Sequence, residues 1–384
     1  MPDLRPTRPL LLFVVTEDWA FWSHRLPMAR AARDAGFAVA VACRAGLHRE
    51  RIEAEGFRVL PLRHLRRESL NPWTEARAVA ELTALYRRER PALVHHVAMK
   101  PVLYGALAAR LAGVPAVVNA LAGMGFVFTA TSVKARVLRP AILAAFRLLL
   151  NRPGSRVLVQ NADDRALFVE RGLVLADRVA LIPGSGVDTN AFVPAPEPSG
   201  PPVALCVARL LWDKGIGELV EAAHLLRARG VALRIRVAGD PDPANPRTIP
   251  EETVRAWSAE GLVEFLGRRD DIAALTAASH IAVLPSYREG MPKALLEAAA
   301  CGRPLVTTDV PGCRALVEDG INGLLVPERD ALALADALER LALDAALRQR
   351  LGQQARRQAE EIYSERAVGR AVADLYRSLV PDAP

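Results

Sequence analysis

The sequence predicts an α/β protein built from two doubly wound parallel-sheet domains. Its 384 residues are enough for two domains of ordinary size, each with its own core. Both halves alternate short runs of valine, alanine, leucine and isoleucine with longer segments of helical period, which is typical of parallel sheets covered by helices. The proline- and glycine-rich segment VPAPEPSGPP (193–202) indicates a linker between the halves.

Twelve apolar runs are the candidate strands, six in each half. Those of the first half are LLLFVV (10–15), AVAVAC (38–43), FRVLPL (57–62), ALVHHV (92–97), AVVNAL (116–121) and RVLVQN (156–161). Those of the second half are VALCVA (203–208), RIRVAG (234–239), EFLG (264–267), IAVLPS (281–286), PLVTT (304–308) and GLLVP (323–327). We therefore expect one domain over residues 1–185 and another over 186–365, followed by a helical segment at 366–380.

The hydrophobic runs are too short for a membrane span. Apolar residues make up 51% of the chain, yet no eighteen of them run without a charge or a breaker, so we expect no membrane-spanning helix. The first run follows two arginines, as in a signal peptide, but it leads into TEDW (16–19) instead of a small-residue cleavage site. We expect it to be the first buried strand.

The cysteines indicate a reducing compartment. None of the four shows C-x-x-C spacing, and each lies in an apolar or turn context: Cys43, Cys206, Cys301 and Cys313. We expect buried free thiols in a cytoplasmic protein, in preference to disulfides or zinc ligands.

Charge is distributed unevenly along the chain. Residues 1–185 contain 27 Lys and Arg against 15 Asp and Glu, whereas the remainder contains 23 against 28. The basic half suits an anionic membrane surface or a lipid diphosphate as partner, and compositional drift in an arginine-rich genome is the alternative. The basic half shows no aromatic-basic interleaving and no recognisable binding module, so we expect no nucleic acid partner.

Charged residues follow the candidate strands of the second half. In parallel sheets of this kind, ligands collect beyond the carboxyl ends of the strands. The residues found just after a candidate strand are Arg209, Asp240, Arg268, Glu289 and Asp309. We therefore expect the binding site of this domain along that edge of its sheet.

The segment SYREGMPKALLEAAACG (286–302) carries the most informative pattern. Pro292 suits the first turn of a helix, which places Glu289 just ahead of that helix and Glu297 inside it. Free N–H groups at a helix start bind phosphate or another anion. Carboxylates beside an anion site are costly unless they bind neutral hydroxyl groups. A nucleotide-sugar, which has a charged middle and polyol ends, meets both demands.

The spacing from Glu289 to Glu297 resembles the E-x7-E signature of the retaining family-4 glycosyltransferases, which have the GT-B fold. Three further segments resemble that family's phosphate-binding, domain-crossing and post-glutamate stretches: ARLLWDKGIGELVEAA (208–223), IPGSGVDTNAFVP (182–194) and TTDVPGCRALVEDGINGLLVP (307–327). The resemblance implies two Rossmann-like domains facing a central cleft. The first would bind the acceptor and the second the nucleotide-sugar, and the 366–380 helix would cross back onto the first domain.

The resemblance also implies roles for individual residues of the second domain. Arg209 and Lys214 would stabilise the charge that the leaving nucleoside diphosphate gains in the transition state. Glu289 would contact the donor sugar near the reacting carbon, and Glu297 the ribose. The remaining nucleotide-sugar contacts would come from Gly290, Met291, Lys293, Arg268 and Asp240. For the side chains of Lys293 and Arg268, simple solvent exposure is the alternative.

Two segments of the first half resemble the branch of the family that adds a hexose or hexosamine to undecaprenyl-diphosphate-linked sugars. They are TEDWAFWSHRLPMARAARDAGFAV (16–39) and VHHVAMKPVLYGALAARLAGVPAVVNALAGMGFVF (94–128). The acceptor residues implied are Ser23, His24, Arg25, His95, His96, Lys100, Gly123 and Gly125. Where many family members have a catalytic histidine, this chain has Val97. That leaves His95 or His96 as candidates, and an ordinary strand-end pair is the alternative.

No cofactor or metal is expected. Gly123 and Gly125 form a G-x-G, but Phe128 replaces the third glycine of the dinucleotide fingerprint, so NAD binding is not indicated. Asp240 and Asp242 form a D-x-D, which in the other large glycosyltransferase fold holds a divalent metal. Because arginine and lysine are available for the diphosphate, we predict metal-independent activity.

Together with this resemblance, the sequence predicts a bacterial cytoplasmic transferase, peripheral on the inner face of the cell membrane. It would move a hexose or N-acetylhexosamine from a UDP-sugar to a lipid-linked saccharide with retention of configuration. The basic segment 133–152, which Pro140 is expected to interrupt, would contact the membrane or pack within its domain. The alternatives are a GT-B transferase with a soluble acceptor, a nucleotide-sugar epimerase of similar fold, and a non-catalytic nucleotide-binding scaffold.

Overall fold

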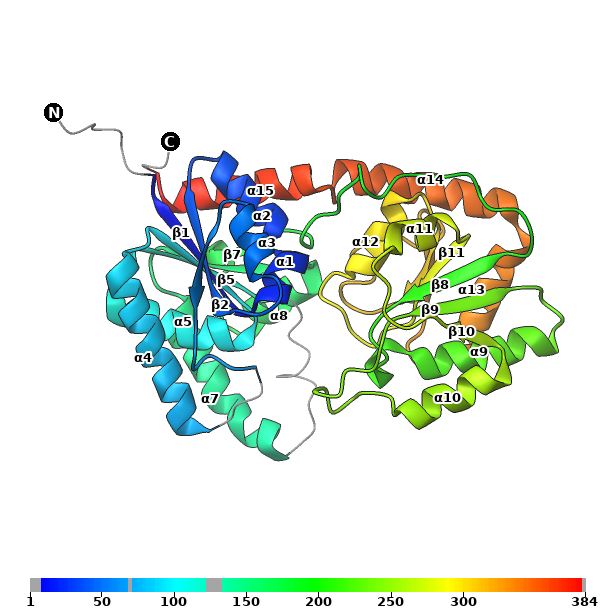
Figure 1. The fold of residues 1–384 in the computed structure, drawn as a ribbon, viewed down its shortest axis with the longest axis horizontal. Coiled ribbons are helices and arrows are strands. Elements are labelled where there is room, and N and C mark those ends of the chain that lie inside the picture. The colour runs from blue at the N-terminus through cyan, green and yellow to red at the C-terminus, as the bar shows by residue number, and fades with distance from the viewer. Residues whose placement is uncertain (1–7, 68–70, 122–132, 382–384) are drawn as a thin grey trace. The chain divides into compact units, whose positions relative to one another are not determined.

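A computed structural model describes residues 8–67, 71–121 and 133–381 of the chain. These residues divide into two compact units (Figure 1). Unit 1 comprises the described residues up to Ser185 together with those from Val368 onward, and unit 2 is Gly186–Ala367. Each unit is a parallel sheet covered by helices, as the sequence predicts.

The sheet of unit 1 has the order β3-β2-β1-β4-β5-β6-β7, with every described pairing parallel. Its strands are β1 (Leu10–Glu17), β2 (Ala38–Arg44), β3 (Arg58–Pro61), β4 (Leu93–Val97), β5 (Ala116–Ala120), β6 (Ser155–Val159) and β7 (Val179–Leu181). The six predicted strands are confirmed. The short edge strand β7 was missed, because its three residues are only partly buried and form no apolar run long enough to be recognised.

Helices cover the sheet of unit 1. They are α1 (Asp18–His24), α2 (Leu26–Asp34), α3 (Arg49–Ala54), α4 (Pro72–Glu89), α5 (Met99–Ala112), α7 (Val133–Leu150), α8 (Ala162–Glu170) and the short η1 (Ala176–Arg178). The last helix, α15 (Glu365–Leu379), begins in unit 2 and continues in unit 1, where Val372 and Tyr376 join the core formed by β1 and α2.

Helix α7 runs through Pro140, so the predicted interruption at this residue is wrong. The proline is exposed, and the helix continues beyond it. Phe146 and Leu150 of α7 are fully buried in a cluster with Phe168 of α8. The described side chains of this segment therefore favour packing within the unit as its main role.

Unit 2 contains a second parallel sheet, of order β10-β9-β8-β11-β12-β13. Its strands are β8 (Val203–Val207), β9 (Arg234–Ala238), β10 (Val263–Phe265), β11 (Ile281–Leu284), β12 (Leu305–Thr308) and β13 (Gly323–Val326). Its helices are η2 (Trp212–Lys214), α9 (Ile216–Ala228), α10 (Glu251–Glu260), α11 (Ile272–Ala277), α12 (Lys293–Ala300), α13 (Ala331–Leu343) and α14 (Ala345–Glu361). All six predicted strands of this half are confirmed.

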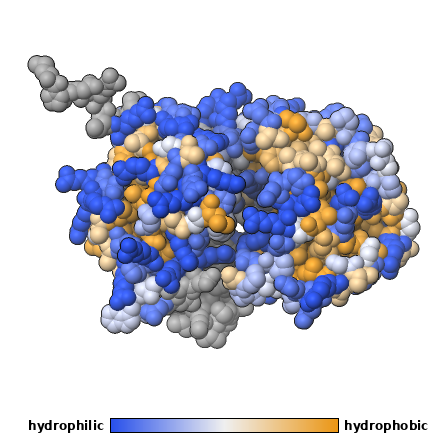
Figure 2. Space-filling model, viewed as in Figure 1, coloured by the Kyte–Doolittle hydropathy of each residue, from blue (hydrophilic) through white to orange (hydrophobic). Residues whose placement is uncertain are grey.

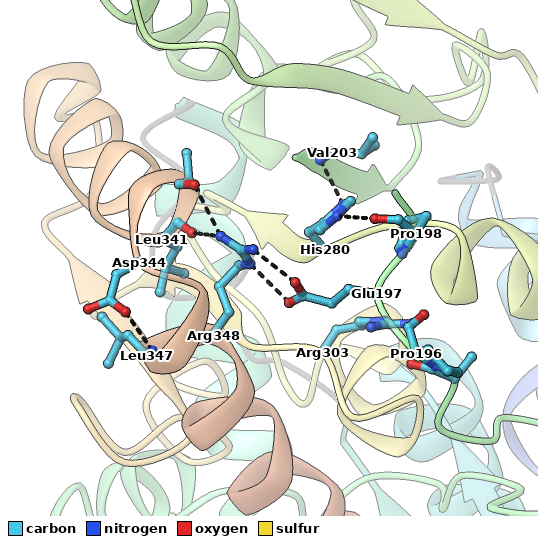
Figure 3. A network of polar contacts seen from close by, with 12 residues as sticks. Pro196, Glu197, Pro198, Val203, His280, Arg303, Leu341, Asp344, Leu347 and Arg348 are labelled. Carbon is cyan, nitrogen blue, oxygen red and sulfur yellow. Dashed lines mark hydrogen bonds and ion pairs between the residues drawn. The ribbon is translucent and has the colours of Figure 1, made fainter. Parts of the chain in front are cut away.

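The proline-rich segment 193–202, which we call the strap, is part of unit 2 and is not a free linker. Figure 3 shows how polar side chains of the unit hold it. Arg348 of α14 makes two hydrogen bonds to the Glu197 carboxylate, at 2.9 and 2.8 Å. Arg303 donates hydrogen bonds to two backbone carbonyls of the strap. His280 Nε2 donates to the carbonyl oxygen of Pro198 at 3.0 Å. The interpretation of this segment as a linker between the halves is therefore corrected. The boundary between the units lies between Ser185 and Gly186, where the domain bounds expected from the sequence also place it.

Both sheets reverse their winding at a central pair of strands, β1 and β4 in unit 1 and β8 and β11 in unit 2. On either side of such a pair the connections run in opposite directions, which leaves a crevice beyond the carboxyl ends of the two strands. Each unit therefore has one point at which its topology favours a ligand.

The surface of the described residues is mixed in character. None of the described helices combines the length and apolar content that crossing a bilayer requires. On the face shown in Figure 2, hydrophobic residues form separate patches among hydrophilic ones. The exposed large apolar side chains include Leu47 and Trp73 of unit 1, which are 95% and 79% exposed. The four cysteines are buried free thiols, as predicted.

Candidate active site

Lys214, Glu289 and Ser286 form a cluster at the reversal point of unit 2. Lys214 ends η2, which follows β8, and Glu289 lies in the loop after β11. Lys214 Nζ pairs with Glu289 Oε1, and Ser286 Oγ donates to the same carboxylate oxygen at 2.7 Å. The lysine and glutamate side chains are 21% and 13% exposed, so the pair is largely shielded but still reachable. Two predicted site residues therefore meet, and Ser286 joins them without having been predicted.

Two glycines allow neighbouring loops to press against this cluster. Gly215 has φ +68°, and a Cβ there would lie 2.0 Å from the carbonyl oxygen of Pro285. Gly312 has φ +84°, and a Cβ there would lie 2.5 Å from the carbonyl oxygens of Glu289 and Gly290. Both positions need left-handed backbone and close approach, which only glycine provides without strain. Gly215 and Gly312 lie in the segments 208–223 and 307–327, which resemble family motifs. Both segments thus pack against the turn that carries Glu289.

Arg209 lies beside this cluster in sequence and has an acidic partner of its own. It is 48% exposed, and its Nη1 lies 2.5 Å from Oδ2 of Asp242. The second acid of the D-x-D is thus engaged by an arginine, while Asp240 is exposed. Among the described residues, no three His, Cys, Asp or Glu side chains come together as metal ligands. The donor set at Asp240 and Asp242 therefore fits an ion pair better than a metal site, and metal independence stays a prediction.

Glu297 lies inside α12, as predicted, and Pro292 is the residue that immediately precedes this helix. Burial raises the pKa of the Glu297 carboxyl above its usual range, and Lys293, with its Nζ 3.5 Å from Oε1, opposes that shift. A buried carboxylate gains from additional donors such as ribose hydroxyls. The structure places Gly290 and Met291 in the turn before the helix, and it leaves Arg268 exposed after β10.

His96 is committed to packing in unit 1. Its Nδ1 lies 2.8 Å from Oδ1 of Asn119, so this nitrogen carries the hydrogen, and its Nε2 lies 2.9 Å from the hydroxyl of Tyr86. The ring is fully buried, and a Cβ on Gly105 would lie 2.3 Å from it. Burial lowers the pKa of His96 to about 4. Both ring nitrogens of His96 are engaged within the unit, so neither is left to contact a substrate. Of the two histidines, His95 is therefore the remaining candidate for a contact with the acceptor substrate.

His95 and Arg25 lie within the core of unit 1, at its own reversal point. His95 is fully buried in β4, and its Nδ1 lies 2.5 Å from the hydroxyl of Tyr376. Arg25 separates α1 from α2, follows β1 in sequence, and is only 2% exposed. Tyr376 comes from the C-terminal helix α15, and no sequence motif had singled it out.

The other predicted acceptor residues lie in less buried surroundings. Ser23 and His24 contact each other near the end of α1, with Ser23 Oγ 2.5 Å from His24 Nδ1. Lys100 Nζ lies 3.0 Å from a carboxylate oxygen of Glu75. Ala98, just before α5, has φ +75° and ψ 168°, a strained conformation for a residue with a side chain. Gly123 and Gly125 lie outside the described residues.

Two doubly wound parallel-sheet units, each with one reversal point in its sheet, are the architecture of the GT-B fold, the class to which many glycosyltransferases belong. The solved structure of sucrose-phosphate synthase from Thermosynechococcus elongatus has the same fold. Its TM-score is 0.82 at 23% identity, covering 97% of this chain and 100% of that one.

The chain belongs to the family-4 glycosyltransferases. Residues 11–160 match the family described as glycosyl transferase 4-like, and residues 201–344 match glycosyl transferases group 1.

Two curated relatives resemble the chain over most of its length. One is the N,N'-diacetylbacillosaminyl-diphospho-undecaprenol alpha-1,3-N-acetylgalactosaminyltransferase of Campylobacter jejuni, which is 26% identical over 94% of this chain and 96% of its own. The other is the UDP-Gal:alpha-D-GlcNAc-diphosphoundecaprenol alpha-1,3-galactosyltransferase of Escherichia coli, which is 28% identical over 71% of this chain and 72% of its own.

Proposed function

We propose that this enzyme transfers a hexose or N-acetylhexosamine from a UDP-sugar to a saccharide linked to polyprenyl diphosphate, in bacterial cell-surface glycan assembly. The observation that carries the proposal is the Lys214, Glu289 and Ser286 cluster at the reversal point of unit 2. The names of the two curated relatives, which state undecaprenyl-diphosphate-linked sugars, support the choice of acceptor.

Donor binding exchanges the partners of the site cations. In the structure, Arg209, Lys214 and Lys293 each face an acid: Asp242, Glu289 and Glu297, respectively. The diphosphate of the donor would replace the acids as partner of the arginine and lysines, while the glutamates accept hydrogen bonds from sugar and ribose hydroxyls. Because the cations gain the diphosphate and the two glutamates gain hydroxyl donors, the exchange leaves neither glutamate buried without a hydrogen-bond partner.

The transfer step breaks the bond between the anomeric carbon of the sugar and the diphosphate oxygen. The acceptor hydroxyl forms a new bond to that carbon on the face the diphosphate vacates, and its proton passes to the departing diphosphate. Arg209 and Lys214 would stabilise the charge that develops on the diphosphate, which lowers the barrier more than it strengthens ground-state binding. This course retains the anomeric configuration and uses no metal.

Membrane attachment would come from unit 1. Its basic composition, including the basic segment 133–152, suits the anionic inner face of the cell membrane, where each surface cation contributes on the order of 1 kcal/mol. Co-sedimentation with vesicles containing anionic lipid should decline steeply as salt is raised. Equal binding to neutral vesicles would contradict this part of the proposal.

The function is tested in two stages. UDP- and GDP-sugars are first screened for an increase in melting temperature, and the stabilising donor is then incubated with a polyprenyl-diphosphate-linked sugar in detergent. We expect transfer of one sugar with its anomeric configuration unchanged, as read by NMR of the product. Chelators should leave the rate unaffected, and a rate abolished by chelation and restored by magnesium would overturn the metal-independent course.

The same assay separates the competing functions. Conversion of the UDP-sugar without any acceptor would identify an epimerase, and transfer only to a water-soluble saccharide would replace the lipid-linked acceptor. Glu289→Gln should abolish transfer, whereas Glu260→Gln, which alters an exposed acid at the end of α10, should leave it intact. Donor binding and turnover that survive Glu289→Gln would refute the assignment of the site.

A further inference from the structure

In the part of unit 1 that the structure describes, Arg25 is a buried cation without a carboxylate partner. The Arg25 side chain donates from Nη1 to the carbonyl of His24 at 3.0 Å, but its Nε is buried and has no hydrogen-bond partner among the described residues. Burial lowers the pKa of Arg25 to about 10, Tyr376 opposes that shift, and no carboxylate of the described residues is among its causes. An ionised guanidinium removed from water is costly unless an anion pairs with it. The buried guanidinium of Arg25 therefore favours the binding of an anion.

The buried ring of His95 adds a second unpartnered group. Its Nδ1 lies 2.5 Å from the hydroxyl of Tyr376, while its Nε2 is buried and has no hydrogen-bond partner within the described ranges. The ring also feels the charge of Arg25, which, after burial, is the next cause that lowers the pKa of His95. A neutral imidazole and a charged guanidinium thus lie near each other, each with an unused nitrogen.

Tyr376 decides which nitrogen of His95 carries the hydrogen. Burial keeps the pKa of Tyr376 far above its usual value, so the phenol stays protonated. If the hydroxyl donates to Nδ1, its hydrogen is satisfied and Nε2 bears the ring hydrogen. The opposite tautomer would leave a buried hydroxyl hydrogen without a described acceptor, at a cost of about 1–3 kcal/mol. The first tautomer therefore turns Nε2 into a donor.

We propose that Arg25 and His95 form a site for a phosphate group of a substrate, and that Tyr376 is a positioning residue that fixes the tautomer of His95. Two unused buried donors, Arg25 Nε and His95 Nε2, call for an acceptor, and a phosphate oxygen is both an acceptor and a countercharge. The start of α2, immediately after Arg25, has no side-chain cap, so its free N–H groups add to the attraction.

The topology supports the same location. Arg25 follows β1 in the chain and His95 lies in β4, the two strands at which the sheet of unit 1 reverses its winding. The site rests on the proposed transferase, whose two substrates both contain diphosphate. Either the donor diphosphate or the diphosphate of the lipid-linked acceptor can supply the phosphate, and the test distinguishes them.

The central test compares Arg25→Met with Arg25→Lys in the full chain. Binding of UDP and of a polyprenyl-diphosphate-linked sugar in detergent is measured by calorimetry. We expect Arg25→Met to weaken one of these ligands at least tenfold and to change the other less than twofold, while Arg25→Lys retains binding within about threefold. Loss confined to the lipid-linked sugar identifies the acceptor diphosphate, and loss confined to UDP identifies the donor. Unchanged binding of both overturns the proposal.

Stability separates a binding role from a structural one. Because a buried cation without a countercharge destabilises the ligand-free unit, Arg25→Met should melt no lower than the wild type. A clearly lower melting temperature, with both ligands lost, would make Arg25 a structural residue and overturn the proposal. Tyr376→Phe provides an independent variant: the KM for the same ligand should rise about three- to tenfold, with kcat within twofold. A change in kcat alone counts against the positioning role.

Failure of the transferase itself has a different signature. Inorganic pyrophosphate is titrated into an Arg209→Ala, Lys214→Ala background, which removes the cations of unit 2. If no sugar is transferred by any assay, pyrophosphate binding that disappears with Arg25→Met still supports the anion site. The same binding unaffected by Arg25→Met overturns it.

Discussion

Acidification should destabilise unit 1 through the buried ring of His96. The ring is neutral in the folded chain, with its pKa lowered by burial from an ordinary 6.5 to about 4. Below pH 6.5 the His96 ring therefore binds a proton in the unfolded chain but stays neutral in the folded chain. The free energy of unfolding decreases as the pH falls. A difference of about 2.5 pKa units corresponds to a total loss of about 3 kcal/mol, of which about 2 kcal/mol is lost by pH 5.

Urea unfolding at pH 7.5 and pH 5.0, followed by tryptophan fluorescence and circular dichroism, measures this loss. His96→Gln keeps a donor for Asn119 and an acceptor for Tyr86 but cannot titrate, so it should lose about 2 kcal/mol less than the wild type between these pH values. His64→Gln, at a partly exposed histidine of the same unit, should behave as the wild type does. Equal pH dependence in the wild type and His96→Gln would refute the reasoning.

Three further outcomes concern unit 2. Lys214→Met should lower kcat/KM about 10²- to 10³-fold while Lys214→Arg retains more activity, and equal rates in steady-state assays would contradict a role in leaving-group stabilisation. Because the pKa of Glu297 is raised by burial, UDP-sugar affinity measured by calorimetry should weaken as the pH falls through that raised pKa, and Glu297→Gln should bind weakly at every pH. Gly215→Ala should lower the melting temperature well beyond Gly230→Ala: both glycines have positive φ, but only at 215 would the new Cβ strike backbone, 2.0 Å from a carbonyl oxygen. Equal melting of the two alanine variants would count against this packing.

Most strands of both sheets could be predicted from the sequence, because parallel strands that are buried on both faces consist of continuous apolar runs. It missed β7, whose three residues are too few and too exposed to form such a run. It took the strap for a linker because proline and glycine content describes local conformation and not attachment. The attachment comes from Arg348, which is 151 residues away from Glu197 in the chain.

The candidate site was predictable to the extent that its residues lie in short motifs. Lys214 and Glu289 were both expected near the carboxyl edge of the sheet, but their direct pairing across 75 residues required the structure. Tyr376 could not be assigned to His95, since 281 residues separate them and a tyrosine on an amphipathic helix carries no sign of its hydrogen bond. The two unpartnered nitrogens of Arg25 and His95 likewise follow from burial, which spacing in the sequence does not encode.

The attachment of the strap determines where glycosyltransferases of this kind can be recombined. Chimaeras that exchange unit 2 should be joined at Ser185 and Gly186, and again at Ala367 and Val368. A crossover inside residues 198–202 looks natural by composition, but it would take Glu197 from one parent and Arg348 from the other. Such hybrids would inherit half of an ion pair, so mismatched parents should express poorly even when both sheets are intact.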